Sequence, residues 1–285
     1  MELKPASSTA VSVARQRAAH QILDGDPKVH EDRLIVGLVP ETTEVAIRAA
    51  ATVLQQEPRR RARANFVLRS RYAEDLLEAA VRTGTRQYVI LGAGLDTFGC
   101  RQPEWAKEIA IVEIDHPASQ NFKRAHLHAA GIALPRNLHF APIDFESESL
   151  SEKFASLPLS KDQTVFFSWL GVTQYLERST LSATLKAIAA WPGGGHLVLT
   201  HIHDDWSALD EVARVAMETA ESFSVESGEP WLSKLSEPSM KNLLHEVGFA
   251  QSTHLSTSEA KKRYFDARTD GLEPAGGIGI AYART

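Results

Sequence analysis

Two glycines that follow an apolar run are the residues of this chain whose spacing points most directly to chemistry. Gly92 and Gly94 come directly after the run Tyr88–Leu91, with Ala93 between them. Glycine has no Cβ and tolerates positive φ, so a strand that ends this way brings its backbone close to a ligand. In an open α/β sheet, small molecules bind beyond the carboxyl ends of the parallel strands. The sequence therefore predicts a nucleotide-like ligand over Gly92, Ala93 and Gly94.

Acidic residues end the next two predicted strands. Asp115 lies about 20 residues after Gly94, where a carboxylate can accept hydrogen bonds from ribose hydroxyls. Asp144 ends the following strand, where it can accept from an adenine amino group while Phe145 packs on the base. Either aspartate can instead cap a turn or a helix. Glycines and two aspartates along one sheet edge favour adenosine, which NAD enzymes and S-adenosylmethionine enzymes share.

Polar residues after the later strands are candidates for handling a second substrate. His201 and His203 end the fifth predicted strand and are candidate general bases for a hydroxyl acceptor, with a structural role as the alternative. Tyr175, after the fourth strand, can orient that acceptor. The run 201–205 also resembles part of a dinuclear metal motif. Trp206 stands where the fuller motif needs another histidine, so we expect no metal.

Alternating strands and helices position these residues. The alternation begins at residue 87 and implies a parallel sheet. The expected strands are Gln87–Leu91, Ile109–Asp115, Leu138–Asp144, Val165–Trp169, His196–His201, Phe249–Leu255 and Ile278–Ala283. No convincing helical pattern separates the last two strands, so we expect them to form an antiparallel pair at the end of the sheet. The helices expected elsewhere lie at about 10–23, 41–56, 58–84, 118–130, 149–154, 179–190, 206–223 and 237–248.

Length and composition restrict the class of protein. The chain has 285 residues, 43% hydrophobic content and a net charge of −5, which is ordinary for a globular protein and argues against a general nucleic-acid binder. No run approaches the ~20 apolar residues of a membrane span. Cys100 is the only cysteine, which fits a reducing compartment. We therefore expect a cytoplasmic protein that binds neither membranes nor nucleic acid.

Four motifs together are typical of one family. They are RYAED at 71–75, LGAGLDT at 91–97, EIDHP at 113–117 and GVTQYL at 171–176. In combination they resemble the leucine carboxyl methyltransferase-like family of S-adenosylmethionine-dependent methyltransferases, whose bacterial members often O-methylate polyketide-type small molecules. The resemblance implies S-adenosylmethionine as the cofactor and a Rossmann-like class I sheet, mostly parallel with an antiparallel terminal strand.

The resemblance also implies roles for individual residues. Arg71 would grip the methionine carboxylate of the cofactor, because a guanidinium fork suits a carboxylate. Asp115 would hold the ribose, and Asp144 would reach the adenine. Many relatives carry a glutamate that contacts the cofactor where this chain has Leu170. The resemblance therefore implies that here another group, such as a backbone carbonyl, makes that contact.

The sequence thus predicts two units. Residues 1–84 form a helical cover, in which Arg15 and Arg17 lie where relatives have a basic residue over the cofactor or else on a solvated helix face. Residues 85–285 form the catalytic domain, with an insertion at about 204–235 that shapes the site of a small-molecule acceptor.

The predicted reaction is methyl transfer to a hydroxyl or carboxylate oxygen. An NAD(P)-dependent oxidoreductase is one alternative, although Thr97 stands where its third glycine would be. A non-catalytic protein that binds an adenosyl ligand is another, which the replacement at Leu170 favours.

Overall fold

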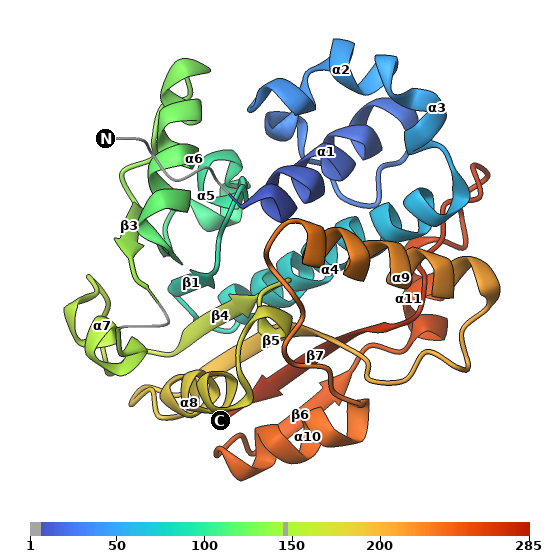
Figure 1. The fold of residues 1–285 in the computed structure, drawn as a ribbon. Coiled ribbons are helices and arrows are strands. Elements are labelled where there is room, and N and C mark those ends of the chain that lie inside the picture. Colours follow the sequence, from blue (N-terminus) through green and yellow to red (C-terminus); the bar gives the residue numbers. More distant parts are fainter. Residues whose placement is uncertain (1–6, 145–147) are drawn as a thin grey trace.

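The computed structural model describes residues 7–144 and 148–285. A seven-stranded sheet lies at its centre, with helices packed on both faces (Figure 1). The strands are β1 Gln87–Leu91, β2 Ala110–Asp115, β3 Leu138–Pro142, β4 Val165–Trp169, β5 Gly195–Ile202, β6 Gln251–His254 and β7 Ile278–Arg284.

The strand order is β3-β2-β1-β4-β5-β7-β6. Strands β1 to β5 are parallel, whereas β7 pairs antiparallel with both β5 and β6. This confirms the predicted mostly parallel sheet with an antiparallel terminal strand. The winding direction reverses between β1 and β4, so the carboxyl ends of these two strands form the switch point at which such sheets bind ligands.

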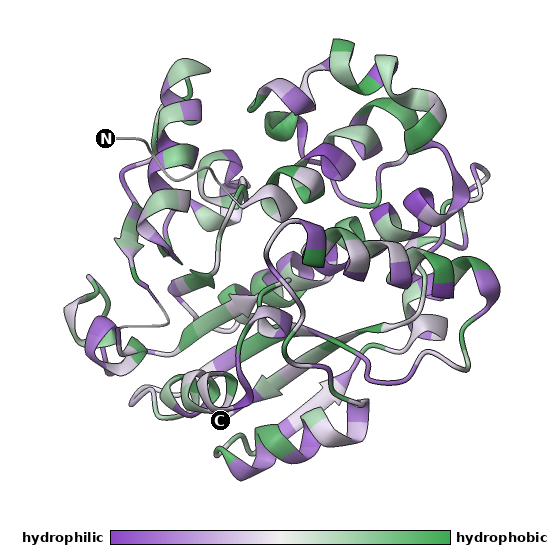
Figure 2. Cartoon of the chain, in the orientation of Figure 1, coloured by the Kyte–Doolittle hydropathy of each residue, from purple (hydrophilic) through white to green (hydrophobic). Residues whose placement is uncertain are grey.

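The central strands form where the sequence has continuous apolar runs. Every residue of β1 and β4 is buried, as expected for parallel strands that are covered on both faces. Figure 2 shows β4 as a largely hydrophobic segment, whereas the surrounding helices carry both hydrophobic and hydrophilic residues. The predicted strand bounds agree with the structure to within two residues at each end.

The helices cover the two faces and one end of the sheet. They are α1 Ser8–Leu23, α2 Glu44–Ala49, α3 Ala51–Leu54, α4 Glu57–Arg82, α5 Phe98–Arg101, α6 Pro117–Ala129, α7 Leu150–Ser156, α8 Arg178–Ala189, α9 Glu211–Glu226, α10 Glu237–Glu246 and α11 Thr257–Tyr264, with 3₁₀ turns η1 Arg33–Ile35, η2 Pro40–Thr42, η3 Glu104–Ala106 and η4 Thr173–Tyr175. Within the described residues, none of them combines the length and apolar character that a membrane crossing requires.

Three helical predictions need correction. The helix expected at about 206–223 begins only at Glu211, because Asp210 caps it by accepting a hydrogen bond from the Ala213 amide at 2.8 Å. The helix expected at about 41–56 is divided into η2, α2 and α3, and Thr43 caps α2 by accepting a hydrogen bond from the Ala46 amide at 3.3 Å. Helix α11 lies between β6 and β7, where no helix was expected. Its signal was present in the sequence, because Ser256 caps it and Glu259 stands three residues later, the pattern of a capping box.

Three apolar clusters organise the layers. Helices α7, α8 and α10 pack on one face of the sheet, and α4 and α11 pack on the other. Helices α1 to α3 form a third cluster, which Leu95 and Leu127 join to the sheet domain. The predicted division at residue 84 stays a prediction, although α4 shares a core with the sheet. Figure 1 shows α4 between the sheet and α1, with α9 beside it.

Candidate active site

The loop after β1, residues 92–97, makes a tight turn at the carboxyl edge of the sheet, and we call it the glycine loop. Gly92 and Gly94 have φ angles of +63° and +49°, a region that glycine adopts without a steric penalty. The amides of Gly92 and Ala93 donate to the Ile114 carbonyl at 2.8 and 3.3 Å. A Cβ on Gly92 would lie 2.3 Å from Cγ2 of Val172, so no side chain fits there.

This loop opens onto a large cavity. Its volume is about 1220 Å³, and α1, α4 and α9 line it together with the strand ends. A typical small-molecule pocket has about 300–1,000 Å³, so this cavity has room for a cofactor and a second molecule. The predicted site residues that line it are Gly92, Ala93, Gly94, Asp115, Asp144, Leu170 and Tyr175. Phe145 lies outside the described residues.

Asp115, at the end of β2, is held by two backbone amides. Gly94 N–H donates to its Oδ2, and His116 N–H donates to its Oδ1 at 2.6 Å. Burial raises the pKa of the Asp115 carboxyl, and these two hydrogen bonds oppose the rise. Each carboxylate oxygen has two acceptor positions, so Asp115 can still accept hydrogen bonds from the hydroxyls of a ligand.

The neighbouring strands bring three more predicted residues to the cavity. Asp144 lies two residues beyond the end of β3, and Leu170 directly follows β4. Gly171, with φ of +74°, donates its N–H to Thr200 Oγ1 at 2.7 Å, which ties this turn to β5. Tyr175 ends η4 on the same side. The carboxyl ends of β1, β2 and β4 and the segment after β3 therefore contribute to one site.

Arg71 does not reach this site. Its side chain is 45% exposed, and its Nε donates to Asp75 Oδ1 at 2.7 Å. Its guanidinium lies 5.9 Å from the ring centroid of Tyr264. The role predicted for Arg71 therefore does not fit its position. The reason is helix phase: side chains two residues apart on a helix point in directions about 200° apart.

Arg69 occupies the place predicted for Arg71. It lines the cavity, with its guanidinium 5.1 Å from the Phe66 ring centroid, and a Cβ on Gly171 would lie 2.5 Å from its Nη1. Burial lowers the pKa of Arg69 to about 10, while Tyr175 and Asp96 oppose the fall. Among the described residues, no carboxylate forms an ion pair with it. The site therefore presents a guanidinium that is ready to bind an anion.

Helix phase was also the signal that sequence reasoning missed. Arg69 follows Phe66 by three residues and precedes Ala73 by four, so it lies on the predicted apolar stripe of α4. Arg71 lies off that stripe. A charged residue within a buried stripe is unusual and indicates a partner or a ligand.

His201 and His203 do not line the cavity. Successive residues of a strand point to opposite faces, and Thr200 faces the cavity, so His201 faces the other way. His201 Nδ1 lies 3.0 Å from the Leu235 carbonyl, and its Nε2 lies 3.3 Å from Nε2 of His254. Burial, reinforced by His203 and His254, lowers the pKa of His201 to about 3. The predicted role of the two histidines as general bases therefore does not fit their positions.

The remaining candidates from the sequence are the metal motif, Cys100, and the arginines Arg15 and Arg17. In residues 7–144 and 148–285, no group of three or more His, Cys, Asp or Glu side chains is placed to hold a metal ion. Burial raises the pKa of the Cys100 thiol to about 11, so it is not a reactive thiolate at neutral pH. Arg15 and Arg17 of α1 both line the cavity, and Arg17 is only 5% exposed, so it does not lie on a solvated face.

Comparisons of sequence agree with this geometry. The profile of the leucine carboxyl methyltransferase family matches residues 10–189. YktD of Bacillus subtilis, assigned as an S-adenosyl-L-methionine-dependent methyltransferase, is 32% identical over 208 residues, which cover 72% of this chain and 67% of YktD. A Streptomyces coelicolor protein with the same assignment is 36% identical over 126 residues, but the match spans less than half of either chain, 42% of each.

Comparisons of structure show the same fold. A solved structure described as a methyltransferase from Thermobifida fusca superposes with a TM-score of 0.59 at 15% identity, covering 96% of this chain and 94% of the other. A DUF574 family protein from Streptomyces avermitilis gives a TM-score of 0.54 at 14% identity, covering 95% and 96%. At such identities these likenesses bear on the fold alone.

Proposed function

This chain belongs to the leucine carboxyl methyltransferase family and is an S-adenosylmethionine-dependent methyltransferase, and we propose that it methylates an oxygen, a hydroxyl or a carboxylate, of a small molecule. The observation that carries the proposal is the shape of the cavity. The same cavity is lined by the glycine loop and Asp115 and, between α4 and α9, by apolar and aromatic side chains together with carboxylates such as Glu218 and Glu226. One part suits the cofactor, and the other leaves space for an acceptor.

The residues at the sheet edge fit the cofactor. The main chain turns at Gly92, where only glycine leaves room for Val172, and the Asp115 carboxylate keeps acceptor positions for ribose hydroxyls. Asp144 lies beside them on the segment after β3, where it can reach the adenine. Arg69 has no carboxylate partner among the described residues, so it can bind the methionine carboxylate. Asp96, which also lines the cavity, can accept from the ammonium group.

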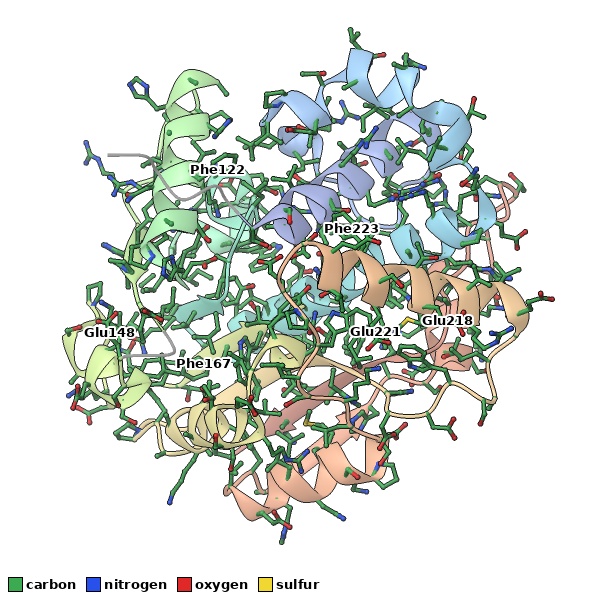
Figure 3. All side chains as sticks on the ribbon, viewed as in Figure 1. Phe122, Glu148, Phe167, Glu218, Glu221 and Phe223 are labelled. Atoms are coloured by element: carbon green, nitrogen blue, oxygen red, sulfur yellow. The ribbon has the colours of Figure 1, made fainter. Side chains whose placement is uncertain are left out.

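The acceptor region lies against α9, within the segment 204–235 that the sequence predicted for it. Met217 and Phe223 of α9, Trp231 beyond it, and Phe66 of α4 line this part of the cavity. Figure 3 shows Phe223 at the end of α9 that lies beside α1. These apolar and aromatic side chains support an acceptor with an apolar or aromatic body.

The protein contributes mainly alignment to the reaction. Bound S-adenosylmethionine supplies a methyl group on a positively charged sulfur. Holding two reactants in line and excluding water can supply up to about 7–11 kcal/mol of the barrier. Of the histidines in the described residues, only His116 lines the cavity, and it lies beside Asp115 on the cofactor side. A hydroxyl acceptor would therefore need a carboxylate of this region, such as Glu218 or Glu226, as its base, whereas an acidic or ionised oxygen needs none. Tyr175 can orient either kind of acceptor by hydrogen bonding.

A turnover screen tests the proposal. The purified protein is incubated with S-adenosylmethionine and a panel of aromatic and aliphatic alcohols, phenols, amines and carboxylic acids, and S-adenosylhomocysteine is measured by mass spectrometry. We expect product with oxygen acceptors and none with the Asp115→Asn variant at limiting cofactor. Methylation of amines alone would contradict the proposed acceptor class. Cofactor binding without turnover of any acceptor would instead favour the non-catalytic alternative.

The remaining expectations concern cellular context. The family resemblance supports polyketide-type acceptors of secondary metabolism, and the single cysteine supports a reducing, cytoplasmic compartment. The oxidoreductase alternative is set aside, because the family match is to methyltransferases and the antiparallel β7 fits the sheet that the family resemblance implies.

A further inference from the structure

A buried polar cluster lies behind the glycine loop. Its centre is Asp32, just before η1, whose side chain has no exposed surface. Asp32 Oδ2 accepts from Arg17 Nη2, and its Oδ1 accepts from the Thr97 hydroxyl at 2.6 Å. Arg101 Nε lies 3.6 Å from Oδ1. Burial alone would raise the pKa of Asp32, but Arg17, Arg101, the neighbouring His30 and the Thr97 hydroxyl hold it below its ordinary value, so the carboxyl is ionised.

Arg17 joins α1 to the same loop by two more hydrogen bonds. Its Nη1 donates to the Leu95 carbonyl at 3.0 Å, and its Nη2 donates to Thr97 Oγ1 at 3.1 Å. Residues 92–96 line the cavity, whereas Thr97 is 1% exposed and does not line it. The cluster therefore holds this loop from behind, at Thr97 and at the Leu95 carbonyl, while the rest of the loop faces the cavity.

Helix α1 closes the cavity on the opposite side of this loop. A Cβ on Gly94 would lie 3.6 Å from the Cβ of Ala10, and the Thr9 amide donates to Glu229 Oε2, beyond α9, at 3.4 Å. Helix α1 and the glycine loop therefore both border the cavity, and the distance between them determines how much space is left for the cofactor. The cluster around Asp32 bonds to both elements, and the apolar packing of Leu95 against α1 adds to this connection.

We propose that Asp32 is a positioning residue for the cofactor: through Arg17 and Thr97 it fixes α1 and the glycine loop relative to each other, so that the site is preformed before the cofactor binds. The inference rests on the proposed function, because it takes the glycine loop as part of the cofactor site. Preformed geometry increases affinity, since the ligand does not have to order the loop and the helix.

A second buried carboxylate provides a matched control. Asp24 accepts from Arg63 Nε and Nη2 at 2.8 and 2.7 Å and lies 2.8 Å from His20 Nδ1. It also ties α1 to a neighbouring element, α4, and its side chain is 2% exposed. It makes no contact with the glycine loop. Asp24→Asn therefore disturbs the same helix and the same kind of ion pair without touching the cofactor site.

Calorimetric titration with S-adenosylhomocysteine tests the inference. We expect Asp32→Asn to weaken binding by about tenfold or more, and Asp24→Asn to change it by less than about threefold, although both variants unfold at lower temperature. Equal affinities of Asp32→Asn and the wild type, or equal losses in both variants, would overturn the inference. Wild-type protein that binds no S-adenosylhomocysteine would overturn the proposed function itself, which is a different result.

A milder pair of variants covers the case in which Asp32→Asn does not fold. Thr97→Val removes the hydroxyl that joins the loop to Asp32 and Arg17, and Thr42→Val removes a buried hydroxyl that donates to the Val39 carbonyl at 2.9 Å, away from the loop. We expect Thr97→Val to weaken binding by about three- to tenfold and to accelerate hydrogen exchange of the amides of 92–97. If Thr97→Val matches Thr42→Val in both measurements, Asp32 has only a structural role.

Discussion

Replacing Arg69 by methionine is the most direct test of the cofactor site. Methionine keeps most of the length and the apolar contact with Phe66 but removes the charge and every donor. The guanidinium lines the cavity and has no carboxylate partner among the described residues, so the variant leaves no buried acid unpaired. The change should therefore act on ligand binding and not on folding.

The magnitude follows from the number of charged hydrogen bonds that are lost. A hydrogen bond to a charged group contributes about 1.5–3 kcal/mol, which corresponds to a loss of about 10- to 150-fold in affinity for S-adenosylhomocysteine. The free energy of unfolding should change by less than about 1 kcal/mol. The lost cation–π contact with Phe66 costs about 0.5–1 kcal/mol, and relief from burying the Arg69 charge offsets it. The melting temperature should stay within about 4 °C of the wild type.

Arg71→Met is the matched control, because it removes the same group two residues along the same helix. Its side chain is exposed and pairs with Asp75 four residues later, an interaction of about 0.2–0.5 kcal/mol. Calorimetric titration of both variants should show a loss of affinity in Arg69→Met only. The assignment of Arg69 is refuted if its variant binds like the wild type, or if Arg71→Met shows the larger loss.

Three further variants probe other parts of the structure. Gly92→Ala should abolish measurable cofactor binding, because its Cβ would lie 2.3 Å from Cγ2 of Val172 and would displace the loop. Gly37→Ala, also at positive φ but with open space around it, should lose only stability. Equal cofactor binding by both variants would contradict the proposed place of the cofactor beside this loop. Asp115→Asn should weaken S-adenosylhomocysteine binding by about 1.5–3 kcal/mol, as measured by calorimetry, and unchanged affinity would remove its ribose role. His201→Gln should make the free energy of unfolding less dependent on pH below about pH 6.5. Because burial lowers the pKa of His201 to about 3, its contribution is present above about pH 6.5 and is lost as the pH falls toward 3. The wild-type free energy of unfolding in urea should therefore fall by up to about 1.4 kcal/mol per pH unit more than that of the variant, and parallel curves would disprove this account.

Most of the fold could be predicted because its signals are local. Parallel strands buried on both faces appear as continuous apolar runs. The predicted first and last residues of β1 and β4 therefore match those of the structure. The antiparallel pairing of β6 and β7 was also expected, although α11 between them was missed. That helix is polar and only one of its residues, Ala260, is buried, so it has little of the apolar periodicity by which helices are recognised.

The errors in the site have one physical origin, which is the phase of a side chain on its element. Successive side chains of a strand point to opposite faces of the sheet. The sequence predicts where β5 lies, but only packing determines which of its faces, that of Thr200 or that of His201, borders the cavity. A helix turns by about 100° per residue, so motif similarity alone did not separate Arg69 from Arg71. At Gly92 and Gly94 no such choice exists, because the proposed role is one of the main chain, which turns there at positive φ. Roles that depend on main-chain geometry are therefore readable from a motif, whereas roles that depend on side-chain direction require the packing of the neighbouring layer, here the apolar stripe of α4 that carries Arg69 into the cavity.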